Sequence, residues 1–340
     1  MAKKITFLGI ETSCDETAAA VIRENDKGTA DILSNIVSSQ IEEHKKFGGV
    51  VPDLASKDHE KKILSIVNEA ITQSAIKLRD VDGIAVTYGS GLLGSLIVGL
   101  NFAKGLAVGL NVPLIGISHL EGHLSSGFIN KNPEFPCISL IVSGGHTQIW
   151  FIENIHKFMV VSNTVDDAAG EAFDKGARIL GLGYPGGPEI EKMAKSGNPL
   201  KYDFPLPQVK NNKFNFSFSG LKTALLYKKN KLDDSGLAYS ENDLAASYQH
   251  AIITSLLDKL EKVICHYKVY NIIIVGGVSA NLYFRDCSLS LKKKYNLNII
   301  FPDLQYCTDN AAMIAMAGYL KLSEINKTDL SIEPNPNIIY

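Results

Sequence analysis

The sequence has few cysteines, and none of them form a closely spaced pair. The five cysteines of the 340-residue chain are an odd number. A disulfide framework needs paired cysteines, and a C-x-x-C pair is the usual sign of a thiol redox or zinc site. The pattern excludes a disulfide-stabilised fold and is typical of a reducing compartment. The cysteines are Cys14, Cys137, Cys265, Cys287 and Cys307.

The chain also lacks an excess of charge of either sign. Its 34 Lys and Arg residues stand against 36 Asp and Glu residues, a net charge of −2 with His taken as neutral. The charge of the whole molecule therefore does not indicate nucleic-acid binding. Any such binding needs a local basic patch.

A long uninterrupted apolar run is missing as well. A secretory leader needs more apolar residues than the short segment between Lys4 and Glu11 provides. The apolar stretch at 91–118 is broken by Lys104 and Pro113, which predicts a buried helix and a strand rather than a membrane span. We therefore expect a cytoplasmic protein with no membrane segment.

Glycine is abundant, with 28 residues, and much of it follows apolar strands. Two apolar runs joined by a polar turn predict a β-hairpin at 5–22, and the same pattern recurs at 137–152. A strand, a glycine-rich loop and a helix occur at 83–109 and again at 271–291. Alternating strands and helices are typical of α/β layers, and the doubled order predicts two similar lobes.

The predicted lobes meet at a proline-bounded connector near residues 133–136. We expect an N-terminal lobe at 1–130, joined by a final helix at 309–325, and a C-terminal lobe at 131–308. Thr308 or Asp309 is the predicted N-cap of the final helix. Residues 326–340 are expected to form a loose tail.

Two histidines stand four residues apart in His119-Leu120-Glu121-Gly122-His123. On a helix this spacing places both rings on one face, where they can bind one metal ion. The alternative is one packed and one exposed histidine. Glu121 lies two residues after His119, which differs from the H-E-x-x-H order of zinc peptidases and predicts a role in the structure or in support of the metal ligands. Asp309 is the best candidate for a third ligand, although a helix N-cap explains it equally well.

Glycine-rich loops follow three of the predicted strands, at 89–91, 143–145 and 276–277. Successive backbone N–H groups in such loops, helped by a following helix, bind phosphate groups. A fourth tight turn, Tyr184–Pro188, could clamp a ring or a ribose. Each loop has the alternative of being a plain turn.

An acidic cluster follows the second of these loops. On a helix, Asp167, Glu171 and Asp174 share one face, next to Asp166. Such charges usually mark a solvated helix face. The apolar and glycine-rich surroundings favour the lining of a cleft.

The segment 192–231 is strongly basic. It holds nine Lys against the single acid Asp203, and six aromatic residues are interleaved. Lysines neutralise nucleic-acid phosphates and exposed aromatic rings stack on bases. The alternative is a compositional bias on a loop whose Phe residues belong to the core, as the alternation of Phe214, Phe216 and Phe218 suggests for some of them.

Taken together and in order, these motifs resemble the bacterial branch of the TsaD family, the tRNA threonylcarbamoyladenosine transferases. No single motif is specific, but the match spans nearly the whole chain. The motifs are GIETSCDET at 9–17, HLEGH at 119–123, VSGGHT at 142–147, DDAAGEAFDK at 166–175, YPGGP at 184–188, FSFSGLKTA at 216–224, GGVSAN at 276–281 and CTDNAAMIA at 307–315.

The resemblance implies an α/β, two-lobed actin-like ATPase fold, a duplicated ribonuclease-H-like architecture. It implies one divalent metal ion, Fe²⁺ or Zn²⁺, bound by His119, His123 and Asp309. Position 191 is Glu, where many relatives carry Asp. The residues expected to contact the threonylcarbamoyl adenylate are Ile141, Val142, Ser143, Gly144, Gly145, Asp174, Gly187, Glu191 and Asn281.

The implied reaction moves a threonylcarbamoyl group from threonylcarbamoyl-AMP to N6 of adenosine 37 in tRNAs that read ANN codons. The candidates for the general base that removes the proton of the amine are Glu11, Asp15 and Glu171. The family typically works with a paralogue of similar fold, TsaB, and a small ATPase, TsaE.

Two other functions fit parts of the pattern. A small-molecule kinase or ATPase of actin-like fold would use the same glycine loops, but such enzymes bind Mg²⁺ through oxygen ligands rather than two histidines. A non-catalytic tRNA-binding scaffold would need no metal.

Overall fold

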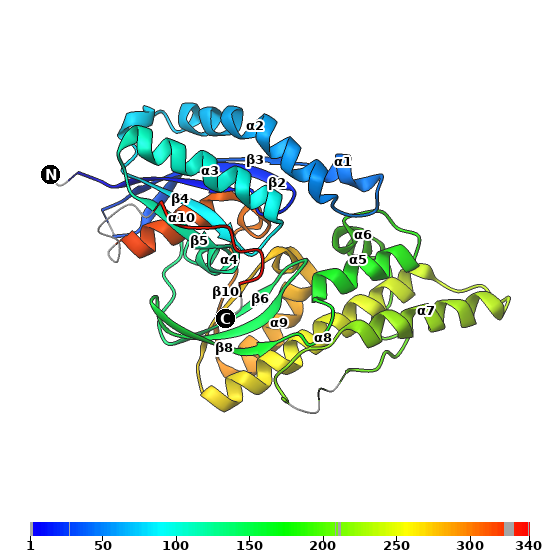
Figure 1. The fold of residues 1–340 in the computed structure, drawn as a ribbon. Coiled ribbons are helices and arrows are strands. Elements are labelled where there is room, and N and C mark those ends of the chain that lie inside the picture. The colour runs from blue at the N-terminus through cyan, green and yellow to red at the C-terminus, as the bar shows by residue number, and fades with distance from the viewer. Residues whose placement is uncertain (1–2, 27, 208, 210–211, 323–329, 339) are drawn as a thin grey trace. The chain divides into compact units, whose positions relative to one another are not determined.

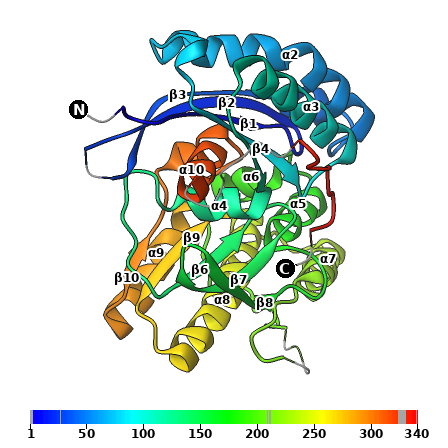
Figure 2. The ribbon, with the colours of Figure 1, turned by 60° about the vertical axis from the view of Figure 1, so that its left-hand side comes forward.

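The computed structural model describes residues 3–26, 28–207, 209, 212–322, 330–338 and 340. They form two compact units, shown in Figure 1 and Figure 2. Unit 1 comprises Met1–Asn132 and Pro302–Tyr340, and unit 2 comprises Pro133–Phe301. Lys210 of the basic segment and residues 326–329 of the predicted tail lie outside the described residues.

The sheet of unit 1 has five strands in the order β3-β2-β1-β4-β5. The first three strands form an antiparallel meander, and β4 and β5 continue the sheet in parallel from β1. The predicted hairpin at 5–22 is thus confirmed. The strands are β1 (Thr6–Glu11), β2 (Glu16–Glu24), β3 (Ala30–Ser39), β4 (Gly83–Gly89) and β5 (Leu114–Ser118).

The sheet of unit 2 repeats this topology with the order β10-β9-β6-β7-β8. Strands β6, β7 and β8 form the antiparallel meander, and β9 and β10 run parallel to β6. The α/β fold with a doubled pattern is confirmed. The strands are β6 (Cys137–Val142), β7 (Thr147–Asn154), β8 (Lys157–Asn163), β9 (Asn271–Val275) and β10 (Asn298–Ile300).

Helices cover both faces of the unit 1 sheet. Figure 1 and Figure 2 show α2 and α3 on one face and α4 and α10 on the other. Helix α2 begins at Pro52, because proline suits the first turn of a helix. The helices of this unit are α1 (Ile41–Lys45), α2 (Pro52–Gln73), α3 (Leu93–Leu110), α4 (His119–Ser126) and α10 (Ala311–Lys321).

The core of unit 2 lies between its sheet and its helices, where Ile138, Phe173 and Tyr248 are buried together. The helix predicted within 271–291 begins at Leu282, after a short 3₁₀ turn at Gly277–Ala280. The helices of this unit are α5 (Ala169–Ile179), α6 (Gly186–Ala194), α7 (Ser219–Asp234), α8 (Glu241–Tyr267) and α9 (Leu282–Tyr295).

Helix α3 is the one helix of the described residues that is long and apolar enough to cross a membrane, with a mean hydropathy of 1.6. Its inner face, with Leu100, Ala103 and Ala107, is packed in the core of unit 1. Core helices of soluble proteins share this composition, so the packing fits the predicted buried helix of a soluble globular protein.

Two glycines let α10 lie against its neighbours. A Cβ atom on Gly9 of β1 would lie 2.3 Å from the Ala311 carbonyl oxygen and 2.6 Å from the Ala315 backbone nitrogen. A Cβ atom on Gly122 of α4 would lie 2.5 Å from Ile314 Cδ1. A side chain at Gly9 would overlap the α10 backbone, so β1 and α10 are in backbone contact, whereas at Gly122 the Ile314 side chain of α10 packs against the α4 backbone.

Residues 330–338 do not form the loose tail that was expected. The Asn335 backbone N–H donates to the Tyr88 carbonyl at 2.7 Å, and the Gly91 N–H donates to the Pro336 carbonyl at 3.2 Å. Ile332 packs against the core of unit 1. The segment stays attached because it continues the hydrogen bonding of β4 and covers an apolar surface.

A buried polar network joins the loop after β1 to α1 and α2. His59 Nε2 lies 2.9 Å from the Cys14 carbonyl, so it donates, and His59 Nδ1 accepts from Thr17 Oγ1 at 2.8 Å. Gln40 links His59 to His44. In this pattern Nδ1 accepts a hydrogen bond, so the His59 ring is neutral. Burial lowers the pKa of His59 and favours this neutral form, although the Cys14 carbonyl and nearby carboxylates act in the opposite direction.

A Gly9→Ala variant should lose about 2–3 kcal/mol of unfolding free energy, because the added methyl overlaps the α10 backbone. Urea unfolding followed by circular dichroism measures this. Gly105→Ala is the matched control: its Cβ meets nothing within 4 Å, and alanine favours a helix. An unchanged unfolding free energy for Gly9→Ala would contradict the close packing of α10.

The unfolding free energy should also fall as the pH drops below about 6.5, the usual pKa of histidine. The pKa of His59 is lower in the folded protein than in the unfolded chain. Below about pH 6.5 the unfolded chain therefore binds more protons, and acid stabilises it relative to the folded protein. His59→Gln should flatten the loss between about pH 7 and about pH 5.5. His156→Gln, an exposed histidine of unit 2, should not. Equal slopes for wild type and His59→Gln would refute this account.

Candidate functional sites of the two units

The two histidines of the HLEGH motif lie at the start of α4, directly after β5. Glu121 fixes this start, because its Oε2 accepts from the Ser118 backbone N–H at 3.2 Å. Its other oxygen accepts from Lys321 Nζ of α10 at 2.8 Å. Glu121 is thus a structural residue, as its spacing predicts.

Asp309 faces both histidines. Its Oδ1 lies 3.2 Å from His123 Nε2 and 3.5 Å from His119 Nε2. Neither Asp309 nor Thr308 is the N-cap of α10, which corrects the prediction. Asn310 has that role, since its side chain accepts from the Met313 N–H at 3.1 Å, and this leaves Asp309 to point at the histidines.

The three side chains fit a metal ion. Their ligand atoms lie within 4.8 Å of one another. Ligands at about 2.1 Å around a tetrahedral ion are separated by about 3.4 Å, close to the distances from Asp309. Both ring nitrogens of His123 are buried without a hydrogen bond in the part of the chain that the structure describes, and a metal would satisfy one of them. The alternative of one packed and one exposed histidine does not hold, as His119 is 7% and His123 0% exposed.

A second layer of side chains lies behind His119. Its Nδ1 is 3.3 Å from Glu11 Oε2 and 3.0 Å from Ser13 Oγ. Burial lowers the pKa of His119, but the charges of Asp309 and Glu11 and the hydrogen bond to Glu11 outweigh it and raise the pKa to about 9. Burial raises the pKa of Glu11, and the charge of His119 with the bonds to His119 and Thr87 more than reverses this.

In unit 2, two glycine loops lie at the carboxyl ends of neighbouring parallel strands. Ser143–Gly145 follow β6 and Gly276–Gly277 follow β9. Gly276 has a φ of +91°, and its Cβ would lie 2.4 Å from the Val142 carbonyl oxygen, so the two loops touch. The Gly170 N–H at the start of α5 donates to the Ser143 carbonyl at 3.2 Å. Two loops and a helix N-terminus therefore meet at the edge where α/β sheets bind phosphates. The preceding residues Ile141 and Val142 are buried in β6.

Asp174 and Gly187 lie next to each other at the start of α6. Asp174 Oδ1 accepts from the Gly186 N–H at 2.7 Å. Nothing lies within 4 Å of a Cβ placed on Gly187. The predicted donor-binding residues of α5 and α6 are thus brought together within unit 2.

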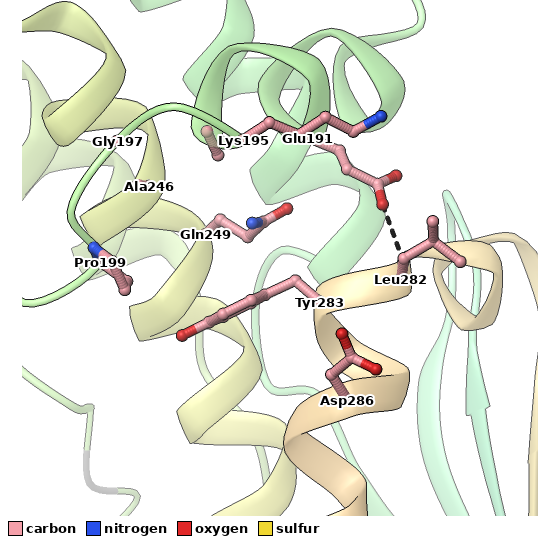
Figure 3. Close-up of a pocket in the computed structure, with 10 residues that line it drawn as sticks. Glu191, Lys195, Gly197, Pro199, Ala246, Gln249, Leu282, Tyr283 and Asp286 are labelled. Carbon is pink, nitrogen blue, oxygen red and sulfur yellow. Dashed lines mark hydrogen bonds between the residues drawn. The ribbon is translucent and has the colours of Figure 1, made fainter.

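Glu191 and Asn281 lie together at the junction of α6 and α9. Glu191 Oε1 accepts from the Leu282 N–H at 2.8 Å, as Figure 3 shows. Asn281 caps α9 through the Phe284 N–H and donates to Gln249 Oε1 at 2.8 Å. Beside them is a cavity of about 260 Å³, whose polar lining residues are Glu191, Lys195, Gln249, Tyr283 and Asp286 (Figure 3).

The acidic cluster does not share one helix face, which corrects the prediction. Helix α5 begins at Ala169, after Asp166 and Asp167. Asp166 accepts four hydrogen bonds from residues 217–219 and so holds the start of α7. Lys175 bridges Asp167 at 2.8 Å and Glu171 at 2.7 Å. Only Asp174 of the four contacts the glycine-rich turn of α6.

Most aromatic residues of the basic segment belong to the core. Phe216 and Phe218 are fully buried and Tyr202, Phe204 and Phe214 pack against the same cluster. Tyr227 on α7 is 71% exposed. Five of the six aromatic rings are therefore core residues, as the alternative to nucleic-acid binding predicts. Tyr227 and the lysines of α7 lie at the surface.

A family model described as "TsaD: tRNA N6-adenosine threonylcarbamoyltransferase" matches residues 31–316. A protein of this name from Thermosipho melanesiensis is 52% identical over 332 residues, covering 97% of this chain and 98% of the relative. One from Clostridium perfringens is 47% identical over 339 residues, covering 99% and 98%.

The solved structures that resemble this chain are more distant. Full-length HypF in a phosphate- and nucleotide-bound form has a TM-score of 0.62 at 12% identity, covering 97% of this chain and 57% of that one. The activator of the 2-hydroxyisocaproyl-CoA dehydratase from Clostridium difficile, with bound ADPNP, has a TM-score of 0.54 at 15% identity, covering 96% and 100%. These likenesses confirm the actin-like ATPase fold. The family model matches most of the chain, and the relatives from Thermosipho melanesiensis and Clostridium perfringens are similar along almost its entire length. The chain therefore belongs to the tRNA N6-adenosine threonylcarbamoyltransferase family.

Proposed function

We propose that this protein transfers a threonylcarbamoyl group from threonylcarbamoyl-AMP to N6 of adenosine 37 in tRNAs that read ANN codons. Membership of the transferase family carries this proposal, and the His119, His123 and Asp309 cluster supports it. In the reaction a bond forms between N6 and the carbamoyl carbon, the bond from that carbon to the phosphate oxygen breaks, AMP leaves, and N6 loses a proton.

The acceptor makes activation of the donor necessary. The N6 lone pair is delocalised into the adenine ring, so the amine is a weak nucleophile. His119, His123 and Asp309 would hold a divalent ion, Fe²⁺ or Zn²⁺, since two imidazoles and one carboxylate suit both metals and leave a coordination position open. When bound, such an ion supplies Lewis-acid polarisation of the donor carbonyl.

Unit 2 would bind the adenylate part of the donor. The backbone N–H groups of Gly144 and Gly145, in the loop after β6, would hold its phosphate and stabilise the departing AMP. Gly187 leaves room for the ribose, and Asp174, Glu191 and Asn281 would position the nucleoside. Fixed reactants reduce the entropy cost of the transfer.

Two carboxylates are candidates for the base that takes the amine proton. Asp15 follows β1 and is 7% exposed. Glu171 on α5 is paired with Lys175 at 2.7 Å. Glu11, the third candidate, already accepts hydrogen bonds at both carboxylate oxygens.

The further partners belong to the same proposal. The tRNA would bind the lysines of segment 192–231, and a TsaB-like paralogue with a TsaE-like ATPase would assist. The protein would work in the cytoplasm, since the scattered free cysteines fit a reducing compartment. A kinase or ATPase of the same fold is less well supported because a His-His-Asp cluster is a poor Mg²⁺ site.

Purified protein should form threonylcarbamoyladenosine in unmodified tRNA when supplied with the partners, threonine, bicarbonate, ATP and the adenylate-forming enzyme. The nucleosides are digested and identified by mass spectrometry. His119→Ala and Asp309→Asn should lose bound metal and product together. Product made without this protein, or no product with adenylate and partners shown to be present, would refute the transferase function. Transfer retained after loss of metal would refute the role of the ion alone.

Lys231→Ala combined with Tyr227→Ala should weaken tRNA binding, because α7 would lose an exposed cation and an exposed ring. We expect the affinity to fall about tenfold and the salt dependence of binding to decrease. Filter binding at several salt concentrations measures both. Lys262→Ala on α8, a lysine paired with Asp258, is the control. Equal losses for the two variants would show that segment 192–231 is not the tRNA surface.

A further inference from the structure

Glu11 is a buried carboxylate at the end of β1, directly behind a metal-binding histidine. It is 0% exposed, and its strand is the central strand of the unit 1 sheet. Its Oε2 lies 3.3 Å from His119 Nδ1, the ring nitrogen on the side away from Asp309. The inference below rests on the proposed metal site.

The hydrogen bonds of Glu11 determine which nitrogen of His119 carries a proton. The Ser13 backbone N–H donates to Oε1 at 2.5 Å, and Thr87 Oγ1 donates to Oε2 at 2.7 Å. An ionised carboxylate only accepts hydrogen bonds. Nδ1 also lies 3.0 Å from Ser13 Oγ, a hydroxyl that can either donate or accept. An N–H on Nδ1 satisfies both Glu11 Oε2 and Ser13 Oγ, whereas a lone pair on Nδ1 would face the carboxylate, so the contacts favour the Nδ1–H form. Nε2 is then the nitrogen that can offer its lone pair on the side of Asp309 and His123.

We propose that Glu11 is a positioning residue whose carboxylate holds His119 in the Nδ1–H form and in the ring orientation that presents Nε2 to the metal. Metal-binding histidines commonly donate their second N–H to such a carboxylate, which also makes the ring a better ligand. Ser13 and Thr87 hold the carboxylate in place from the loop after β1 and from β4. Glu11 thus acts on the metal through His119.

The same contacts oppose a role of Glu11 as the base for the amine. Its two oxygens receive three donors, and none of its surface is exposed. A substrate proton could reach it only by displacing one of these donors. His123 has no comparable carboxylate, since its Nδ1 is buried without a hydrogen bond in the described part of the chain, so its orientation comes from packing.

Glu11→Gln should weaken metal binding about 10–100-fold. The amide nitrogen is a donor, so it either opposes the Ser13 N–H or forces His119 Nδ1 to become an acceptor. Zn²⁺ and Co²⁺ are titrated into metal-free protein by calorimetry and by Co²⁺ absorption. In Zn²⁺-loaded protein, NMR should show a slowly exchanging His119 Nδ1–H that is lost or exchanges faster in the variant. The thermal midpoint is measured alongside.

Asp82→Asn is the matched control. Asp82 also accepts a backbone N–H in unit 1, from Thr6 at 3.0 Å, but it lies at the start of β4, before Gly83. Its loss should lower the thermal midpoint and leave metal affinity unchanged. If Glu11→Gln does not fold, Thr87→Val, which removes one donor to Glu11, should lower the affinity several-fold and speed exchange of the Nδ1–H.

The outcomes separate the two proposals. If wild type binds one ion that Asp309→Asn loses, while Glu11→Gln binds it within about twofold and keeps the Nδ1–H, the metal site stands and the positioning role is wrong. If only Thr87→Val folds, unchanged metal affinity and a retained Nδ1–H in that variant likewise show that the positioning role is wrong. If wild type binds no ion at His119, His123 and Asp309, both the metal site and the role of Glu11 are refuted.

Discussion

The packing of α10 against β1 and α4 is the constraint on which the candidate metal site depends. Asp309 is separated from His119 by 190 positions of chain, so only tertiary packing can bring its carboxylate within 3.5 Å of His119 Nε2. That packing needs Gly9, because a Cβ there would overlap the α10 backbone, and Gly122 leaves room for the Ile314 side chain of α10. The Lys321–Glu121 pair adds a polar contact between α10 and α4 at 2.8 Å. The glycine of HLEGH is therefore as much a part of the site as the two histidines.

Features that depend on neighbouring positions in one helix could be predicted from the sequence, whereas contacts between distant positions could not. The i, i+4 spacing placed both histidines on one face of α4, and the phase of Glu121 indicated its structural role, because both follow from helix geometry alone. The choice between ligand and N-cap for Asp309 could not be made from sequence, since Asp309 and Asn310 are both good caps. Only the coordinates show that Asn310 takes the cap. The edge strands β3 and β8 were missed because their polar faces hide the strand period.

The doubled sheet order places different chemical groups at corresponding points of the two units. In each unit the strand at the centre of the sheet, β1 or β6, ends in a loop and has a parallel neighbour, β4 or β9. In unit 1 the end of β1 and the loop after it carry Glu11 and Ser13, polar side chains that face His119. In unit 2 the equivalent loop carries Gly144 and Gly145, which leave the backbone open for an anion. The same topology thus offers side chains in one unit and backbone N–H groups in the other.

The buried polar groups of unit 1 form a layered support for one ring. Glu11 and Ser13 contact His119 Nδ1, and Thr87 contacts Glu11. The contacts of His119 and Thr87 are not visible in the sequence because they join positions up to 108 residues apart. The next layer, His59 with Thr17 and Gln40, holds the Cys14 carbonyl and so the loop that carries Ser13. A buried carboxylate or imidazole without such partners would destabilise the core. These polar groups are tolerated in the core because they form hydrogen bonds with one another. His119 Nε2 is left to face Asp309 and His123.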